Sequence, residues 1–572
     1  MSMLNGEIAA VFKEMADLLE IKGENPFKVR AYRNAARVVE NMGKSLESLV
    51  KEGYDLTELP GIGHDLSEAI EEIVFSGKFS KLEELKKEIP QGLKELLSIE
   101  GLGPKRIRVL YEKFNVTSLE DLSKLAESGE IYKIKGFGPK LVSKILEGVK
   151  LAKKSGRRFR FDTAKPYAED IKRYLFEFKG VIKVEVAGSY RRRKETVGDL
   201  DILVVAENWE EVSEYFVKYD KVKTVVSKGE TRSTVILQND LQVDLRSVSR
   251  ESYGSALHYF TGSKAHNIKI RKMAQERGWK INEYGVFNEK NEKIAGEDEE
   301  GVYEKMGLCF IEPELREDRG EIEACLQNGL PDLIKREDIK GDLHIHSVYT
   351  DGKASIKEMA LAASELGYEY IAVTDHSKHL TVAKGLDEER IKIQWEEIDR
   401  LNEELDITIL KGIECDILED GSLDLKDEIL SSLDIVLGAV HYKFNLSKKE
   451  QTERVVKALK NPYLHVLAHP TGRLIGAREA FEMDMDEIFK VCREEGKVLE
   501  INAQPQRLDL NDIYAKAAKE AGIKFSISTD SHTRDCLSFM EYGVNQARRG
   551  WLEKEDVINA LTLNELKRFL KR

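Results

Sequence analysis

The sequence predicts a multidomain chain in three parts: a helical N-terminal part, a mixed α+β middle part and a C-terminal barrel of parallel strands. Its 572 residues are enough for about three to five domains. Apolar residues recur at helical spacing through residues 1–150, short β-branched runs fill residues 155–250, and strand-like runs alternate with helical stretches from residue 341 onward. Hydrophobic residues make up 41% of the chain, which is typical of a globular protein.

Composition excludes several classes of protein. No stretch approaches the roughly 18 apolar residues of a membrane span, and the apolar start of the chain carries acidic residues, unlike a signal peptide. We therefore expect a cytoplasmic protein without a membrane partner. The five cysteines are solitary, which indicates a reducing compartment and argues against a disulfide framework or a thiolate zinc site.

The net charge of -13 is unevenly distributed. Basic residues outnumber acidic ones in residues 101–200, and acidic residues outnumber basic ones in residues 341–572. The first region suits a phosphate backbone and the second suits metal cations. Charge runs are more often solvated faces, so charge by itself decides neither reading.

Three short turns in the helical part share one pattern: LPGIG at 59–63, EGLGPK at 100–105 and KGFGPK at 135–140, each before an amphipathic helix. A Gly-x-Gly turn leaves backbone N–H groups at a helix start, where a phosphate is stabilised. One such turn is commonly a plain helix cap, but three of them favour contact with DNA. They resemble the helix-hairpin-helix module, which binds the DNA backbone without reading sequence. The expected DNA-binding residues are Gly61, Gly63, Gly101, Gly103, Lys105, Gly136, Gly138 and Lys140.

The middle part contains strand-like runs at 181–190, 200–205, 223–227, 233–238 and 241–248, the last two joined by a tight turn at Asn239-Asp240. Asp199 and Asp201 alternate on one predicted strand, so both carboxylates leave the same face. Asp244, on a later strand, is expected beside them. Oxygen ligands suit Mg²⁺ or Mn²⁺, and three carboxylates can hold two ions for phosphoryl transfer. Any one of these aspartates by itself is more often an edge-strand residue.

The preceding segment, AGSYRRRKETVGDLD, adds a small-residue turn at Gly188-Ser189 and the guanidinium of Arg192, both suited to phosphate oxygens. Together with the aspartates, this pattern resembles the nucleotidyltransferase signature of family X DNA polymerases, the DNA polymerase beta class. YFTGSKAHNIKIR at 259–271 and EPELRE at 312–317 are also similar to that family, so the resemblance spans roughly residues 1–318.

The resemblance implies a role for each matching residue. Asp199, Asp201 and Asp244 would bind the metals, and Asp244 would assist deprotonation of the primer 3′-OH. The triphosphate would be held by Ser189, Arg192 and Gly198. The sugar would lie against Tyr259, Phe260 and Gly262, which exclude a 2′-OH. The remaining two, Asn267 and Arg271, would contact the base edge or primer terminus and the template strand.

Three positions depart from the family pattern. Lys264 lies where the polymerase beta branch has an acidic residue, and Gln242 replaces an arginine near the catalytic aspartate. Ala69 lies where the family's lyase domain carries a Schiff-base lysine. Because alanine cannot form an imine, deoxyribose-phosphate lyase activity by that route should be absent.

Seven of the chain's 11 histidines cluster around the ends of the predicted barrel strands: six lie in DLHIHS, TDHS, AVHYK, AHPTG and TDSH, and the seventh, His379, lies three residues past His376. Acidic residues lie nearby. One histidine on an apolar strand is usually a core residue, but five strands with the same placement favour a metal site for Zn²⁺, Mn²⁺ or Fe²⁺. His379 and His465 do not fit the strand-end placement. The order of the motifs is similar to the polymerase and histidinol phosphatase (PHP) domain, a seven-stranded (β/α)7 barrel with three metals.

The PHP resemblance implies three ligand sets. One ion would be bound by His344, His346, Glu414 and Asp530, a second by Glu414, His441 and His469, and a third by Asp351, His376 and His532. Asp351 stands where some members have histidine, which favours Mn²⁺ over Zn²⁺. The implied reaction is metal-assisted hydrolysis of a phosphoester.

The whole chain resembles the bacterial and archaeal polymerase X type. We expect an N-terminal lyase-like helical domain at 1–85, a helix-hairpin-helix fingers domain at 86–154, a palm at 155–250, a thumb at 251–318, a helical linker at 319–340 and the PHP domain at 341–572. The implied function is gap filling in DNA repair, base excision repair included, by a monomer that uses dNTPs and primed or gapped duplex DNA. The PHP domain would trim 3′ ends, with 3′-phosphatase and abasic-site endonuclease action as further options. Two alternatives stay open: a PHP domain that hydrolyses a small phosphomonoester while the N-terminal half recruits it to DNA, and a scaffold with both sites vestigial.

Overall fold

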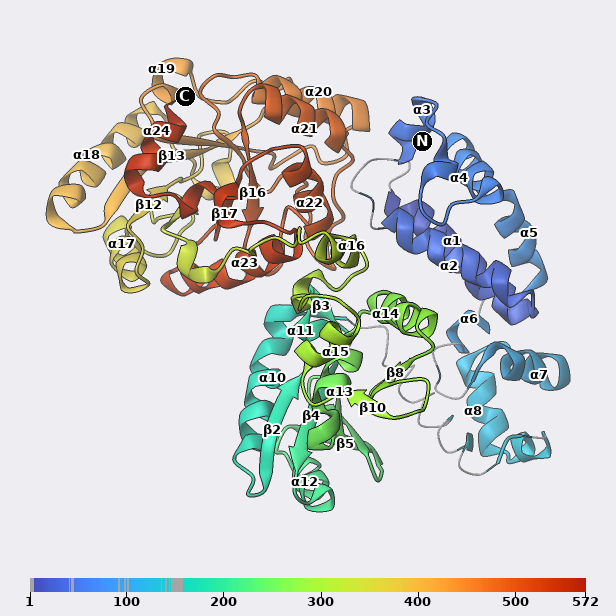
Figure 1. Cartoon of the computed structure of the whole chain (residues 1–572). Coiled ribbons are helices and arrows are strands. Elements are labelled where there is room, and N and C mark those ends of the chain that lie inside the picture. Colours follow the sequence, from blue (N-terminus) through green and yellow to red (C-terminus); the bar gives the residue numbers. More distant parts are fainter. Residues whose placement is uncertain are drawn as a thin grey trace. The chain divides into compact units, whose positions relative to one another are not determined.

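The computed structural model describes residues 5–40, 42, 46–90, 93–96, 99, 102–134, 136–138, 141–142, 145 and 158–571. The chain folds into two compact units. The first comprises Met1–Arg158 with Lys223–Val226 and Ile236–Asp240, and the second comprises Phe159–Val222, Ser227–Val235 and Leu241–Arg572 (Figure 1). Of the expected DNA-binding residues, Gly101 and Lys140 lie outside the described residues.

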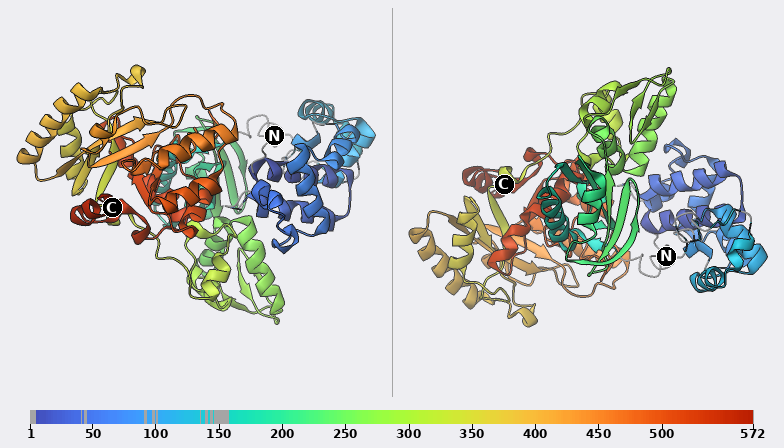
Figure 2. Two further views of the ribbon diagram at one scale, coloured as in Figure 1. Left: turned by 90° about the horizontal axis from the view of Figure 1, so that it is seen from above. Right: turned by 90° about the horizontal axis from the view of Figure 1, so that it is seen from below.

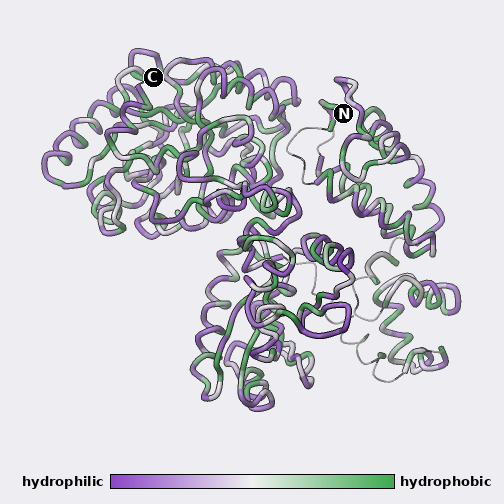
Figure 3. Tube along the Cα trace, viewed as in Figure 1, coloured by the Kyte–Doolittle hydropathy of each residue, from purple (hydrophilic) through white to green (hydrophobic). Residues whose placement is uncertain are grey.

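The N-terminal part is helical, as predicted. Its elements are α1 (Asn5–Lys22), α2 (Pro26–Glu40), α3 (Leu46–Lys51), η1 (Leu56–Glu58), α4 (His64–Ser76), α5 (Ser80–Glu88), α6 (Leu93–Leu96), α7 (Pro104–Phe114), α8 (Leu119–Glu127) and η2 (Glu130–Lys133). Hydropathy alternates along α1, α2 and α4 (Figure 3), because each helix buries one face. Phe12 lies at the centre of this core, with its ring centroid 5.7 Å from that of Tyr32 and 6.4 Å from that of Phe79.

The middle part folds around a five-stranded sheet with strand order β2-β4-β7-β6-β5. The strands are β2 (Val181–Val186), β4 (Asp199–Ala206), β5 (Val222–Lys228), β6 (Arg232–Leu237) and β7 (Gln242–Ser247); β1 (Phe159–Arg160) and β3 (Thr196–Val197) form a separate pair. The helices are α10 (Phe161–Phe176), α11 (Gly188–Arg191) and α12 (Trp209–Phe216), followed by η3 (Arg250–Ser252). The predicted strands and the turn at Asn239-Asp240 are confirmed, since Asp240 closes the turn with a φ of +70° and its N–H donates to the carbonyl of Leu237.

A smaller subdomain follows and corresponds to the expected thumb. It contains α13 (Tyr253–Thr261), α14 (Lys264–Glu276), β8 (Lys280–Asn282), β9 (Gly285–Phe287), β10 (Lys293–Ala295), α15 (Glu299–Lys305) and η4 (Pro313–Leu315). Its three strands form one antiparallel sheet.

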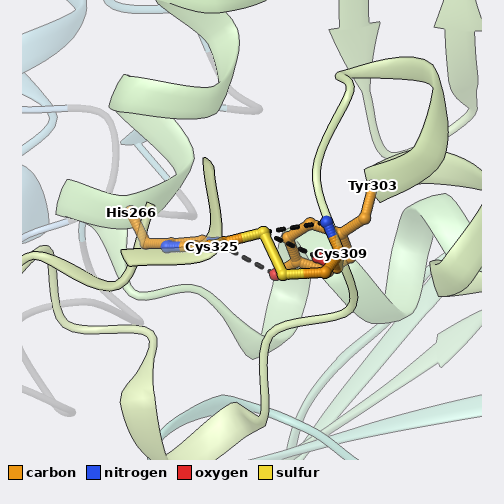
Figure 4. Close-up of a disulfide and its surroundings, with 4 residues drawn as sticks. All are labelled: His266, Tyr303, Cys309 and Cys325. Carbon is orange, nitrogen blue, oxygen red and sulfur yellow. Dashed lines mark hydrogen bonds between the residues drawn. A yellow bond between two sulfur atoms is a disulfide. The ribbon is translucent and has the colours of Figure 1, made fainter. Parts of the chain in front are cut away.

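The sequence argues against a disulfide framework, but the structure pairs two of the five cysteines. Cys309 and Cys325 form a disulfide with Cα atoms 5.9 Å apart (Figure 4). The N–H of Cys309 also donates to Sγ of Cys325 over 2.8 Å. The segment between α15 and the short helix at Glu321–Leu326 brings these two positions together, and spacing along the chain does not reveal that approach. Cys415, Cys492 and Cys536 are free thiols.

The segment expected as a linker, residues 319–340, is helical only in part and is packed. It contains the short helix α16 (Glu321–Leu326) and η5 (Arg336–Asp338). Leu333 and Ile334 are buried, and the N–H of Ile334 donates to the carbonyl of Leu552 over 3.0 Å. Leu333 packs in the core of the thumb subdomain and Ile334 in the core of the barrel, so this segment is packed rather than a free tether.

The C-terminal part is the predicted barrel of seven parallel strands in sequential order. The strands are β11 (Gly341–Ile345), β12 (Tyr370–Val373), β13 (Thr408–Asp416), β14 (Ile435–Ala439), β15 (Val466–Leu467), β16 (Val498–Asn502) and β17 (Phe525–Ser528). A parallel bridge between Ile345 and Ser531 nearly closes the ring. Helices surround the strands (Figure 1, Figure 2): α17 (Ile356–Glu365), α18 (Glu388–Glu404), α19 (Asp427–Leu430), α20 (Lys448–Leu459), α21 (Met485–Glu494), α22 (Asp512–Glu520), α23 (Met540–Arg549) and α24 (Leu563–Leu570), with η6 (Thr381–Ala383), η7 (Arg534–Phe539), η8 (Lys554–Asp556) and η9 (Ile558–Ala560).

The barrel strands are covered on both faces. Every residue of β11, β12, β14, β15, β16 and β17 is buried, as expected for parallel strands enclosed by helices. The polar ends of these strands therefore meet at one rim, where barrel sites form. Among the helices of the described residues, none combines the length and the apolar character of a membrane span.

Candidate active sites

The Gly-x-Gly turns of the N-terminal part have the same local structure. Their central residues, Ile62, Leu102 and Phe137, are buried, and each N–H donates to a carbonyl three residues earlier. The second glycine of each turn, Gly63, Gly103 or Gly138, accepts hydrogen bonds from the following helical turn. The buried residue anchors the turn and leaves the described glycines at the surface, which is the arrangement that favours phosphate contact.

Backbone conformation accounts for glycine at the first position of these turns. Gly61 has a φ of +84° and Gly136 a φ of +94°, values that favour glycine. The space around the turns is open, because no heavy atom outside their neighbours lies within 4 Å of the Cβ position at Gly61, Gly63, Gly103, Gly136 or Gly138. Ala69, at the position where a lyase lysine was considered, is buried in α4.

In the palm, β4 and β7 pair in parallel, with Asp201 directly beside Asp244. Asp199 is on the same face of β4 as Asp201 because strand residues alternate. Gly188 lies against this face: a Cβ there would lie 3.1 Å from Oδ2 of Asp201. The structure therefore brings the predicted aspartates and the small-residue turn to one place on the sheet.

Arginines neutralise the palm carboxylates. Arg232 Nη2 lies 3.0 Å from Oδ2 of Asp244, which also accepts from Gln242 over 3.1 Å. Arg246 Nε lies 3.4 Å from Oδ1 of Asp201. Burial and the neighbouring Asp199 raise the pKa of Asp201 to about 6, although Arg246 opposes the rise.

The carboxylate donors fit hard divalent cations. Among the described residues, however, the groups of three ligand side chains within 4.8 Å of one another lie in the barrel and on the exposed start of α4, and the palm aspartates do not form such a group. A divalent cation would relieve the repulsion that raises the pKa of Asp201. The residue types and the shared sheet face thus suit Mg²⁺ or Mn²⁺.

The expected nucleotide-binding residues converge beside these aspartates. Nη1 of Arg192 donates to the carbonyl of Thr261 and lies 3.3 Å from the Cβ position at Gly262. Asn267 Nδ2 donates to the carbonyl of Tyr259 over 2.7 Å. This places the triphosphate arginine of the sequence prediction against the turn expected to hold the sugar.

Arginine side chains lie over the rings of two aromatic residues of the same region. The guanidinium of Arg271 lies 5.0 Å from the ring centroid of Tyr259, and that of Arg246 lies 4.3 Å from the ring centroid of Phe260. Ser189 belongs to α11, and Gly198 is an exposed residue directly before β4. Lys264 begins α14 after the cap residue Ser263. Phe260 is thus linked through Arg246 to the carboxylate face.

The barrel gathers the predicted metal ligands at the ends of its strands. The donors form three groups, and within each group the ligand atoms lie within 4.8 Å of one another. The groups are His346, Asp351, His376 and His532; His344, His346 and Asp530; and His376, Glu414 and His441. His469 joins the third group, because its Nε2 lies 2.8 Å from Oε1 of Glu414. All nine residues proposed from sequence therefore lie in one cluster, and His346 and His376 each belong to two groups.

Glu414 is at the centre of this cluster. Its Oε1 lies 3.1 Å from His441 Nε2 and 2.8 Å from His469 Nε2. Its Oε2 lies 2.8 Å from His376 Nδ1 and 3.5 Å from Nε2 of both His344 and His346. One carboxylate thus faces five imidazoles, as a ligand that bridges two ions would.

The buried donors in this cluster fit transition-metal ions. Nδ1 of His346 and Nδ1 of His469 are buried and have no hydrogen-bond partner within the described residues, and unpaired buried polar atoms are costly. Burial and the neighbouring imidazoles lower the pKa of His346 to about 3, so its imidazole is neutral at physiological pH. Burial opposes protonation of His376, but Glu414 and Asp351 outweigh burial and raise its pKa to about 10.

Supporting residues of both sites were missed from the sequence. Glu500 Oε1 lies 2.7 Å from His344 Nδ1, and Asp416 Oδ1 lies 2.6 Å from His441 Nδ1; such partners fix the orientation of ligating imidazoles. A buried carboxylate within the apolar run VLEIN was the available signal for Glu500. Arg191 ties the palm to the thumb through Glu299, with an Nη2 to Oε2 distance of 2.6 Å. His379 and His465 are outside these ligand groups, as expected.

Comparison with known families agrees with this arrangement. Residues 3–79 match the helix-hairpin-helix domain family, 93–150 the SAM-like helix-hairpin-helix tandem, 162–271 the DNA polymerase beta palm, 256–317 the DNA polymerase beta thumb and 342–504 the PHP domain.

Individual relatives cover the chain in whole or in part. The chain is 42% identical over 570 residues, 99% of each chain, to a Bacillus subtilis protein named DNA polymerase/3′-5′ exonuclease PolX. It is 28% identical over 243 residues to a probable phosphatase of Thermoanaerobacter, covering 40% of this chain and 94% of the relative. It is 24% identical over 347 residues to DNA polymerase lambda of Arabidopsis thaliana, covering 55% of this chain and 62% of the relative. The full-length match shows that the chain belongs to the PolX family of DNA polymerase/3′-5′ exonucleases, in which a polymerase beta palm and thumb are joined to a PHP domain.

Proposed function

We propose that this protein fills short gaps in DNA during repair and trims 3′ ends with its PHP domain. One observation carries the proposal for the polymerase site: Arg192 reaches the Thr261-Gly262 turn of the thumb beside the paired strands that bear Asp201 and Asp244. Nucleotide, primer and metals would meet at this point.

In the polymerase site, Ser189, Arg192 and Gly198 bind the triphosphate in this proposal. Tyr259, Phe260 and Gly262 line the sugar, with Asn267 and Arg271 on the primer and template side. Two Mg²⁺ or Mn²⁺ ions held by Asp199, Asp201 and Asp244 would supply charge stabilisation at the attacking and leaving oxygens. Asp244 accepts the proton of the primer 3′-OH.

In the PHP site, the nine strand-end residues hold up to three Mn²⁺ or Zn²⁺ ions, which would supply Lewis acidity for phosphoester hydrolysis. Glu414 would be a ligand shared by two of these ions, and Glu500 and Asp416 orient His344 and His441. The proposed substrate is the terminal phosphodiester of a DNA 3′ end. Removal of 3′ phosphates and cleavage at abasic sites belong to the same chemistry.

A small phosphomonoester is the second candidate substrate of the barrel. The similarity over 243 residues to a relative named a probable phosphatase supports it. In that case the N-terminal half only recruits the barrel to DNA.

The protein's partners follow from these sites. We propose that it acts as a monomer in the cytoplasm on primed or gapped duplex DNA with dNTPs, and that the helix-hairpin-helix turns hold the duplex backbone through Gly61, Gly63, Gly103, Lys105, Gly136 and Gly138. The domain boundaries expected from sequence, at 85, 154, 250, 318 and 340, are part of this proposal.

A single assay tests both activities. The pure protein is incubated with a labelled gapped duplex, with and without dNTPs and Mn²⁺, and the primer length is followed. Extension with dNTPs and shortening without them are the expected results. Hydrolysis of histidinol phosphate faster than shortening of the DNA 3′ end would replace the exonuclease proposal with the small-substrate hydrolase.

A further inference from the structure

A buried ion network connects the barrel helix α23 with the palm turn that carries Arg192. Arg549, at the end of α23, is 2% exposed. Its Nη1 donates to the carbonyl of Arg192 over 2.7 Å and lies 3.1 Å from Oε1 of Glu317. Its Nη2 lies 2.6 Å from Oδ2 of Asp512, the first residue of α22. One barrel arginine thus contacts both the backbone of Arg192 and the carboxylate beside it.

Glu317 is shared between Arg192 and Arg549. The same oxygen, Oε1, lies 3.0 Å from Arg192 Nε and 3.1 Å from Arg549 Nη1. Burial alone would raise the pKa of Glu317, but Arg549 and Arg192 outweigh burial and lower it to about 2. Because the carboxylate is charged, removing one arginine leaves it more strongly bound to the other.

A second barrel contact holds the other end of the same turn. Arg473, in the loop after the ligand His469, places Nη2 2.7 Å from Oε2 of Glu195. The N–H of Phe161 donates to the carbonyl of Glu195 over 2.9 Å. The turn from α11 to β3 is therefore fixed from the barrel side near both of its ends.

We propose that Arg549 is a positioning residue for the polymerase site, and that it holds Arg192 where it meets the nucleotide triphosphate. It does so in two ways: it fixes the backbone carbonyl of Arg192, and it takes up part of the charge of Glu317 that would otherwise restrain the Arg192 guanidinium. The inference rests on the proposed role of Arg192 in nucleotide binding. It makes the PHP domain a structural component of nucleotide selection, independent of its own hydrolytic chemistry.

The test compares Arg549→Gln with Arg548→Gln in the full chain. Arg548 is the preceding residue of α23, and it also contacts a segment outside the barrel, with Nε 2.9 Å from Oε1 of Glu314. Its polar contacts within the described residues include neither Arg192 nor Glu317. Arg548 is therefore the matched control. In gap filling, Arg549→Gln should raise the KM for dNTP roughly five- to tenfold, the lower range of couplings between linked sites. The kcat should change much less, and Arg548→Gln should leave the KM unchanged.

Two further variants distinguish positioning from general loss of structure. Arg549→Lys keeps the charge but cannot bind the carbonyl and both carboxylates in one plane, so it should give a smaller rise in KM. When Arg192→Gln is already present, Arg549→Gln should add nothing, because the two residues act through one contact. The rate of 3′ trimming and the melting temperature of each variant report whether the barrel is folded, and Arg549→Lys decides the matter if Arg549→Gln does not fold.

The outcomes distinguish the positioning role of Arg549 from the triphosphate-binding role of Arg192. If Arg192→Gln raises the KM but neither Arg549 variant does, or if Arg548→Gln has the same effect as Arg549→Gln, the positioning role is wrong. If Arg192→Gln itself leaves the KM unchanged, the proposed triphosphate role of Arg192 fails instead. Additive effects in the double variant would also refute the inference.

Discussion

Replacing Glu414 with glutamine should separate the two activities of this chain. The change keeps the size of the side chain and removes the charge that faces five imidazole nitrogens at 2.8 to 3.5 Å. Oε1 faces His441 and His469, and Oε2 faces His344, His346 and His376. Glu414→Gln should therefore weaken the binding of two of the three proposed ions.

The expected loss of metal and of 3′ trimming in Glu414→Gln can be estimated from the ligand groups that the substitution leaves intact. The group of His346, Asp351, His376 and His532 keeps all four of its side chains, so metal content should fall from up to three ions to about one. A single outer partner of a metal ligand is worth about 10- to 100-fold. A bridging ligand should exceed that range, so 3′ trimming should fall by more than about 100-fold, or about 2.7 kcal/mol in the barrier.

The assay measures metal content of the purified full-length chain after loading with Mn²⁺, and then follows shortening and extension of a labelled gapped duplex. Glu419→Gln is the matched control, because Glu419 is a half-exposed carboxylate 3.7 Å from Lys443. Gap filling should be unchanged in both variants. Unchanged metal content in Glu414→Gln, or loss of extension together with trimming, would refute the assignment of Glu414 as a bridging ligand of a separate site.

Three further outcomes are expected. Asp244→Asn should reduce templated extension by roughly 100- to 1000-fold, the range for one preorganised transition-state contact, and leave 3′ trimming intact; extension at the wild-type rate would contradict the palm assignment. If each of the three Gly-x-Gly turns neutralises one phosphate, duplex affinity should fall roughly 40-fold between 50 and 200 mM salt. Replacing Gly136, with its φ of +94°, by valine should strain the turn and weaken duplex binding; binding that salt does not affect would make the turns simple helix caps. Burial would raise the pKa of Glu299, but Arg316 and Arg191 lower it to about 2. Glu299 should therefore contribute about 3 kcal/mol to the free energy of unfolding. This contribution should be complete above its ordinary pKa of 4.5 and decrease as the pH falls toward 2. In urea unfolding at pH 5 and at pH 3, the stability difference between wild type and Glu299→Gln should narrow at the lower pH, and a constant difference would be inconsistent with this ion pair.

Local sequence patterns determined most of the secondary structure and the placement of the barrel histidines at strand ends. Alternation in GDLDIL put Asp199 and Asp201 on one face of a strand, and β4 confirms it. Apolar strand runs placed the histidines at strand ends, because parallel strands in a barrel end at one rim. These inferences succeed because strand and helix periodicity depend on residues that are neighbours in the chain.

Contacts between distant segments were decided only by tertiary packing. The disulfide between Cys309 and Cys325 and the packed course of residues 319–340 have no local signature. The contact of Arg549 with Arg192 joins residues 357 positions apart. Sequence periodicity cannot predict contacts between such distant positions. These contacts depend on how whole surfaces pack and on how buried charges are paired once water is excluded. The sequence alone therefore determined which chemistry each part of the chain carries, and the tertiary structure decided that the PHP barrel also supports the turn proposed to bind the polymerase's nucleotide.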